Sequence, residues 1–179
     1  MKNTVLLTCT ALTLMSCGGG GSVDFATRGI QGANLVSDWS PVARTSAQSL
    51  PSGTFNYQGV AGFKLGNQST EAIVTTADAL ASASITANFD QDTISGKLTD
   101  FVDYTNTRGA GEVNLRNGSI SGNTFSADAT GSVTYLGTPL VVQGVVGGEF
   151  RGSSADAVGA RIDGYWGGQV VSGVIVAER

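Results

Sequence analysis

The 179-residue chain has no histidine and only two cysteines and two methionines. Without histidine there is no Ser-His-Asp or Cys-His catalytic group, no imidazole metal ligand and no side chain whose ordinary pKa lies near neutrality. Charged residues make up only 13% of the chain, and 10 basic residues stand against 14 acidic ones without a basic cluster. Because nucleic-acid binding needs concentrated positive charge, it is disfavoured. We therefore expect no catalytic residues, no metal and no cofactor.

Glycine is abundant, with 26 residues and no collagen-like period. Each glycine inside a helix costs about 1 kcal/mol relative to alanine, so this content favours tightly turned or sharply curved β-structure. The length of the chain allows one domain with its own core.

The first residues have the features of a signal peptide. Lys2 is followed by an apolar stretch over residues 5–14, which is too short to span a bilayer because that requires roughly twenty residues. Leu14, Ser16 and Cys17 resemble the lipobox of bacterial lipoproteins. This resemblance implies that residues 1–16 are a lipoprotein signal peptide and that Cys17 carries the lipid. The alternative is an ordinary secretory signal in which Cys17 is incidental.

Processing before Cys17 would also remove Cys9, so no disulfide would be available. Gly18 occupies the second position of the processed chain, where aspartate tends to retain lipoproteins in the inner membrane. We therefore expect a protein that is attached to the outer membrane through Cys17, and exposure at the cell surface stays open.

Residues 17–52 are interpreted as the lipidated cysteine followed by a flexible, glycine-rich tether and a linker. The part of the linker from Val23 onward has no clean period. It predicts a strand-like patch at residues 34–36 and a short helix that opens at Ser37, with Pro41 in its first turn.

From residue 53 onward, polar and apolar residues alternate with the period of two that is typical of strands. The clearest cases are residues 84–89, 93–99, 112–116 and 124–130. Turns are predicted at residues 90–92, 117–118 and 122–123, where Asn-Gly and Gly-Asn pairs accept positive φ.

These short strands indicate an all-β domain over residues 53–179, built as an antiparallel sandwich or barrel. Glycines at strand positions favour the barrel, because they permit the bends that closure needs. Residues 169–177 are apolar on both faces and should meet an early strand, for which residues 54–63 are the candidate. A barrel that spans a membrane is disfavoured, because the outward positions are polar.

The C-terminal part resembles the barrel domain of transferrin-binding protein B and related surface lipoproteins. The resemblance rests on Gly148, Phe150, Gly152 and Ala155, on the glycine turn at residues 167–168, and on segments at residues 55–61, 87–98, 120–125 and 173–179. It implies a single eight-stranded antiparallel barrel, filled by side chains, on an outer-membrane lipoprotein. Membership of such a family does not by itself identify the ligand.

Two segments are candidates for partner contact. Residues 100–109 form the longest interruption between clear strands, and this predicted loop carries Tyr104 and Arg108, which are residue types found at binding hot spots. The alternative is that its aromatic residues cap the barrel. A second patch combines Arg161, Tyr165 and Trp166, where Trp166 could instead plug the barrel.

Other candidate sites are weaker. Haem iron would have only tyrosine as a ligand after processing, and we interpret the four tyrosines as core or rim residues. They are Tyr57, Tyr104, Tyr135 and Tyr165. Asp90 and Asp92 are interpreted as residues of a solvated turn rather than calcium ligands.

Taken together, these observations predict a monomeric outer-membrane lipoprotein that is not an enzyme. Its barrel would act as a binding or accessory module for a host or environmental protein or a small solute. The alternative function is a structural envelope lipoprotein without a soluble ligand.

Overall fold

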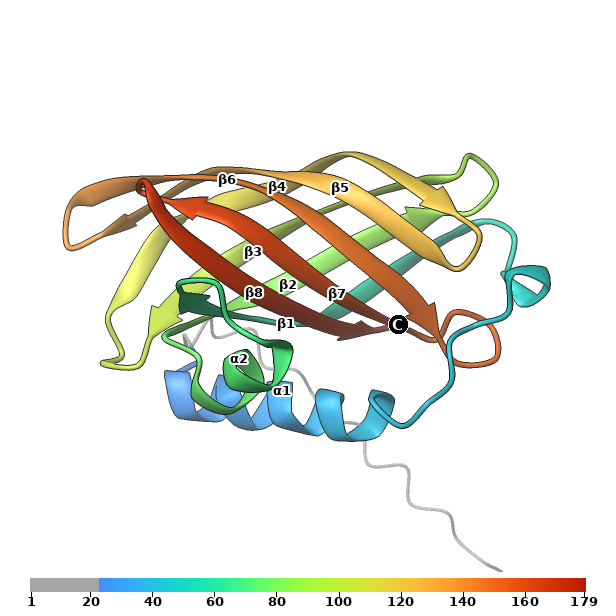
Figure 1. The fold of residues 1–179 in the computed structure, drawn as a ribbon, viewed down its shortest axis with the longest axis horizontal. Helices are drawn as coiled ribbons and strands as arrows, with labels where there is room; N and C mark the ends of the chain where they lie inside the picture. Colours follow the sequence, from blue (N-terminus) through green and yellow to red (C-terminus); the bar gives the residue numbers. More distant parts are fainter. Residues whose placement is uncertain (1–22) are drawn as a thin grey trace, which may run out of the picture.

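The computed structural model describes residues 23–179, so the predicted signal peptide, Cys17 and the glycine spacer lie outside the described residues. Eight antiparallel strands form a closed barrel in which each strand pairs with the next along the chain and β8 pairs with β1 (Figure 1). The strands are β1 (Thr54–Leu65), β2 (Ala79–Asn88), β3 (Thr93–Asp103), β4 (Arg108–Ser121), β5 (Thr124–Tyr135), β6 (Thr138–Arg151), β7 (Ala157–Trp166) and β8 (Gln169–Glu178). This confirms the predicted eight-stranded barrel and the predicted meeting of the last strand with an early one.

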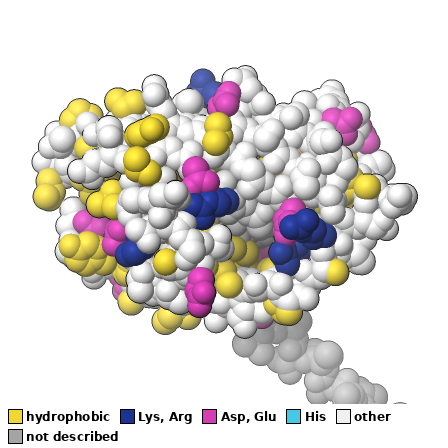
Figure 2. Space-filling view, viewed as in Figure 1, with side chains coloured by type: hydrophobic (Ala, Val, Ile, Leu, Met, Phe, Trp, Pro, Cys, Tyr) yellow, Lys and Arg dark blue, Asp and Glu magenta, His cyan; other side chains and the backbone are white. Residues whose placement is uncertain are grey.

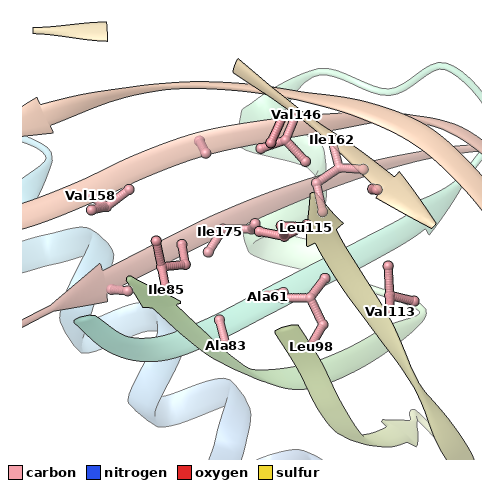
Figure 3. Packing of buried hydrophobic residues seen from close by; sticks show 14 of the residues in the cluster. Ala61, Ala83, Ile85, Leu98, Val113, Leu115, Val146, Val158, Ile162 and Ile175 are labelled. Atoms are coloured by element: carbon pink, nitrogen blue, oxygen red, sulfur yellow. The ribbon is translucent and has the colours of Figure 1, made fainter. Parts of the chain in front are cut away.

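Alternation along the strands fills the barrel with side chains. In β5 the inward residues Phe125, Ala127 and Ala129 are buried, and the polar residues between them are exposed. Branched aliphatic residues from all parts of the barrel meet in its centre, among them Ile85 and Ile175 (Figure 3). Each such side chain contributes about 1.5–3 kcal/mol when it is fully buried, so the barrel interior is the main source of stability.

Glycine permits close contact at the seam between the first and last strands. A Cβ atom at Gly59 in β1 would overlap the backbone carbonyl oxygen of Val176 in β8. Any larger residue at this position would push the two strands apart. The high glycine content therefore serves barrel closure, as the composition predicted.

Two of the three turn predictions are confirmed, at residues 90–92 and 122–123, and the third is wrong. Gly122, with φ of 56°, lies in the predicted tight turn between β4 and β5. Asn117 and Gly118, however, lie inside β4, where the pairing with β5 shifts register between Arg116 and Ser119. Asn117 has φ of 53°, and its tolerance of this conformation serves a β-bulge instead of a hairpin turn.

The linker prediction is wrong for residues 25–39, which form helix α1 (Phe25–Trp39) in place of a strand-like patch and a later short helix. The Asp24 carboxylate caps the helix by accepting a 2.7 Å hydrogen bond from the Thr27 backbone N–H. Pro41 follows the end of the helix and does not open it. Only one helix residue, Arg28, is buried, which explains why the amphipathic period is weak in the sequence.

Tertiary contacts hold α1 against the outside of the barrel. Phe25 and Leu35 pack on a small cluster formed by Val60, Leu80 and Val102. The guanidinium of Arg28 donates a hydrogen bond to the backbone carbonyl of Asp100 in β3. At the other end of the helix, Trp39 Nε1 donates to the Glu178 carboxylate over 2.8 Å.

The chain then crosses one end of the barrel as an extended strap, which we define as residues 40–52. The backbone N–H of Thr45 donates to the Phe150 carbonyl, and the strap includes a short 3-10 helix (Ala47–Ser49).

A second helix, α2 (Thr70–Thr76), which was not predicted, lies between β1 and β2 in the chain and packs beside β8. Within residues 23–179, no helix combines the length and the apolar character needed to cross a membrane.

Candidate functional site

The two ends of the barrel differ in what covers them. We call the end that is crossed by residues 40–52 the strap end, and the opposite end the mouth end. The mouth end contains the last residues of β1, β3, β5 and β7 and the first residues of β2, β4, β6 and β8, and it lies at the left of Figure 1.

A cavity of about 390 Å³ lies at the mouth end, and we call it the mouth. Its walls are mainly apolar and include Phe63, Leu65, Tyr135, Leu140, Trp166 and Val171. Trp166 is buried, and its ring centroid lies 5.1 Å from that of Phe63 and 5.6 Å from that of Phe101. Trp166 therefore plugs the barrel, as one of its two interpretations predicted.

Two polar atoms in the wall of the mouth have no hydrogen-bond partner among the described residues. They are the Trp166 Nε1 and the Tyr135 hydroxyl, and both are buried. Burial raises the pKa of Tyr135 to about 12, with a smaller contribution from the negative charge of Asp103. The Tyr135 hydroxyl thus keeps its proton at neutral pH, and both groups are potential donors.

Exposed apolar side chains gather around the same end. Residues 23–179 contain nine large hydrophobic residues that are exposed, and six belong to the mouth end. These six are Leu65, Tyr104, Leu136, Val141, Tyr165 and Val170. Figure 2 shows hydrophobic side chains concentrated at the corresponding end of the surface. Exposed apolar side chains gathered at one end of a molecule are typical of an interaction site.

The predicted contact loop is shorter than the sequence suggested, because β3 continues to Asp103 and β4 begins at Arg108. Phe101 belongs to the core, while Tyr104 is 68% exposed. The Asp103 carboxylate orders the loop by accepting hydrogen bonds from the backbone N–H groups of Thr105 and Thr107.

The loop also contacts the start of α1. Asn106 accepts a 2.9 Å hydrogen bond from the Phe25 backbone N–H, and Arg108 donates to the Val23 carbonyl over 3.3 Å. Tyr104 thus lies in the loop, and Arg108 is the first residue of β4 directly after it. Tyr104 is presented to solvent, whereas Arg108 also connects the barrel to the N-terminal segment.

The second predicted patch is divided by the barrel wall. Trp166 points inward, whereas Tyr165 lies on the outer surface and is 57% exposed, because consecutive strand residues face opposite sides. Arg161 also lies on the outer surface, where it forms a 2.7 Å ion pair with Asp163 and donates to the Gln68 carbonyl. These three residues do not form a single site.

The strap end holds a network of charges that sequence reasoning missed. The Glu149 carboxylate pairs with both Arg44 of the strap and Arg151 of β6, and its side chain is only 15% exposed. A groove of about 480 Å³ runs beside it between α1 and the outer face of β6–β8. On the face shown in Figure 2, the hollow lies between two groups of basic and acidic side chains. Glu149 and Arg151 are close in the sequence, but Arg44 is far from both, so no local motif predicts the complete network.

A second ion pair closes the same end of the barrel near the C-terminus. Arg179 pairs with Asp156 over 2.5 Å, and its guanidinium lies 4.7 Å from the centre of the Phe55 ring. The hydrogen bond from Arg179 is the largest influence that lowers the pKa of Asp156.

The remaining candidates have structural roles. Tyr57 is fully buried, its hydroxyl donates to the Ala155 carbonyl over 2.8 Å, and burial raises its pKa to about 12. Asp90 accepts a hydrogen bond from the Gly53 backbone N–H, and Asp92 adopts φ of 53° in the β2–β3 turn. Within the described part of the chain, no group of three or more acidic, cysteine or histidine residues is placed to hold a metal.

A small closed barrel, filled by its own side chains and bordered by an outer helix, defines the class as a compact eight-stranded β-barrel domain. The family model for the "C-lobe and N-lobe beta barrels of Tf-binding protein B" matches residues 50–179. The chain belongs to this non-catalytic family of binding barrels.

Solved structures with a similar barrel share little sequence with this chain. Intact transferrin-binding protein B (Ap-TbpB, both lobes) is 19% identical, with a TM-score of 0.47 over 75% of this chain and 28% of that one. Isotype 1 of the same protein from serogroup B Neisseria meningitidis is 18% identical, with a TM-score of 0.48 over 76% of this chain and 27% of that one. A protein described as a surface lipoprotein is 18% identical, with a TM-score of 0.49 over 76% and 65% of the two chains.

This chain thus matches only about a quarter of the length of the two transferrin-binding proteins. The comparison with curated proteins found no match.

Proposed function

We propose that this protein is an outer-membrane lipoprotein whose barrel is a non-enzymatic binding or accessory module for a host or environmental protein or a small solute. The observation that carries the proposal is the family match over residues 50–179, joined to a mouth end with an exposed apolar surface. Solved relatives include proteins named for binding transferrin and one described as a surface lipoprotein. Their names support a binding role at a membrane surface and leave the ligand open.

The lipid anchor belongs to the proposal and rests on the lipobox around Cys17. Cys17 precedes Val23 by six positions, and an extended chain of that length reaches at most about 20 Å. The Val23 carbonyl contacts Arg108 at the mouth end. A lipid on Cys17 would therefore keep the mouth end within about 20 Å of the membrane surface. A partner that binds at the mouth end would have to approach it near that surface.

Tyr104 and Arg108 are the proposed partner-contact residues. Tyr104 offers an amphipathic ring at 68% exposure on a loop that is held by Asp103 and by the start of α1. A rigidly supported tyrosine beside an arginine suits a protein surface, because both residue types contribute strongly to binding hot spots.

The anchor is tested by replacing the lipidated cysteine. We expect Cys17→Ala to leave a folded barrel that is released from the outer-membrane fraction. Cys9→Ala, which changes the predicted signal peptide only, is the matched control and should remain in that fraction. Recovery of Cys17→Ala in the outer membrane would refute lipid anchoring at this residue.

The contact loop is tested by affinity capture with the purified Cys17→Ala protein as bait. Additional Tyr104→Ala or Arg108→Ala changes should abolish capture of a specific partner, whereas the controls Val145→Ala and Arg116→Ala, at exposed positions outside the mouth end, should not. Circular dichroism of each variant confirms that the barrel is intact. Capture that is unchanged by both loop substitutions would remove this loop from the proposal.

Protease treatment of intact cells addresses the rival function. A surface-exposed binding module should be cleaved from cells, and a structural lipoprotein that faces the periplasm should be spared until the outer membrane is opened.

A further inference from the structure

Two neighbouring hydrogen-bond donors at the mouth require an explanation. The Trp166 Nε1 and the Tyr135 hydroxyl are both buried without a partner among the described residues, and the two rings pack edge-on with centroids 6.3 Å apart. An unpaired buried polar group costs about 1–3 kcal/mol, and native proteins retain few of them. Two such groups, on residues whose rings pack together in one cavity wall, indicate that the wall is arranged for something other than stability alone.

The cavity beside these donors has the shape and lining of a small-molecule site. Its volume of about 390 Å³ lies in the range of ligand pockets, and mouths of β-barrels are common locations for them. Phe63, Leu140 and Val171 supply apolar wall on several strands. A mainly apolar wall with a few polar groups gives affinity through burial and orientation through hydrogen bonds.

The charges at the mouth restrict the ligand further. Asp78 and Asp103 line the cavity, and the one lysine in the lining, Lys64, is paired with Asp78 over 3.3 Å. Because Lys64 and Asp78 balance each other, the remaining charge of the lining is that of Asp103, and it disfavours an anionic ligand. The indole N–H can only donate, so it calls for an acceptor in the ligand.

We propose that the mouth is a binding site for a small, neutral and largely apolar molecule whose hydrogen-bond acceptor, such as a carbonyl oxygen, pairs with Trp166 and Tyr135. The two donors are covered by neighbouring side chains in this structure. The acceptor reaches them when a side chain of the cavity wall moves. This deepens the proposed function by naming a class of small solute.

The neutral naphthyl ketone prodan is a suitable probe, because its fluorescence reports both an apolar site and hydrogen bonding to its carbonyl. We expect saturable binding of one prodan per full-length Cys17→Ala protein. Dimethylaminonaphthalene, which lacks the carbonyl, should bind about 25-fold more weakly, as the loss of both hydrogen bonds predicts.

Removal of each donor provides the specific test. Tyr135→Phe and Trp166→Phe should each weaken prodan binding about fivefold and leave binding of dimethylaminonaphthalene unchanged. Tyr57→Phe is the matched control, because its hydroxyl is also buried but already has a partner at the other end of the barrel. It should not alter prodan binding.

Two results would overturn the proposal: the absence of saturable prodan binding to the parent protein, or prodan binding that neither Tyr135→Phe nor Trp166→Phe weakens. If Trp166→Phe fails to fold, Tyr135→Phe decides alone, because it removes one oxygen atom that has no protein partner. Membrane fractionation and protein capture are independent of this outcome, so failure here would not disprove the lipoprotein proposal.

Discussion

The two ends of the barrel use similar aromatic side chains for different purposes. At the strap end, Phe150 contacts the rings of Tyr57, Phe89 and Phe125, and the strap covers it with Thr45 bonded to its carbonyl. At the mouth end, Trp166 contacts Phe63, Phe101 and Tyr135, yet two polar atoms are left without partners among residues 23–179 beside an open cavity.

This difference separates stability from recognition within one small barrel. The strap end is covered, paired in charge and satisfied in hydrogen bonding, as expected for a part of the fold that supports the rest. The mouth end retains exposed apolar residues and unpaired donors, features that lower stability and are typical of binding sites.

The largest effect is expected from removing the central aromatic of the strap end. Phe150→Ala should lower the free energy of unfolding by about 3–5 kcal/mol, because a fully buried ring is replaced by a cavity. Urea unfolding of the purified variant measures this loss. Phe55→Ala, a change to a partly buried neighbour, should cost clearly less. A cost below that of Phe55→Ala would contradict the assignment of Phe150 as the centre of this cluster.

The next effect concerns a satisfied buried hydroxyl. Tyr57→Phe should lower the free energy of unfolding by about 1–2 kcal/mol, because the Ala155 carbonyl loses its 2.8 Å donor and stays buried. Thermal and urea unfolding both report the change. Stability equal to that of the parent protein would show that this hydrogen bond contributes nothing.

A pH-dependent effect is expected at the Asp156–Arg179 pair. The pairing lowers the pKa of Asp156 in the folded protein, so its stabilising effect is present above the unfolded pKa of about 4. That effect disappears as the pH falls through the still lower folded value. Asp156→Asn should therefore reduce stability at pH 6 and differ least from the parent protein near pH 2. A stability difference that stays constant between pH 6 and pH 2 would contradict this role.

The smallest effect on stability is expected at the mouth rim. Leu136 is 88% exposed, so Leu136→Ser should change the free energy of unfolding by no more than about 0.5 kcal/mol. It should still weaken prodan binding slightly, because it removes apolar surface beside the cavity. A large loss of stability would mean that the rim belongs to the core.

The barrel could be predicted from the sequence because the patterns that indicate its strands and turns are local. Alternation marks strands such as β5, and the Gly122–Asn123 turn follows from tolerance of positive φ. The same tolerance of positive φ led to the wrong prediction of a turn at Asn117 and Gly118, because a bulge and a turn require similar backbone conformations. Only strand pairing distinguishes the two, and pairing is not local.

Helix α1 and the mouth were missed for a related reason. The helix is stabilised by contacts with Val60, Leu80 and Val102, which no pattern within residues 25–39 reveals. The mouth brings Tyr135 and Trp166 together only through barrel closure. Tyr104 and Arg108, in contrast, could be placed near each other from their spacing, although Arg108 begins β4 rather than lying in the loop and its contact with Val23 could not be predicted.

The contrast between a stabilising strap end and a binding mouth end is tested most directly by the thermal stability of Tyr135→Phe. This stability is measured with and without prodan and compared with that of the parent protein. The account predicts that the variant alone is at least as stable as the parent, because its lost hydroxyl has no protein partner, and that prodan stabilises it less. A variant destabilised as strongly as Tyr57→Phe, or stabilised by prodan as much as the parent protein, would contradict it.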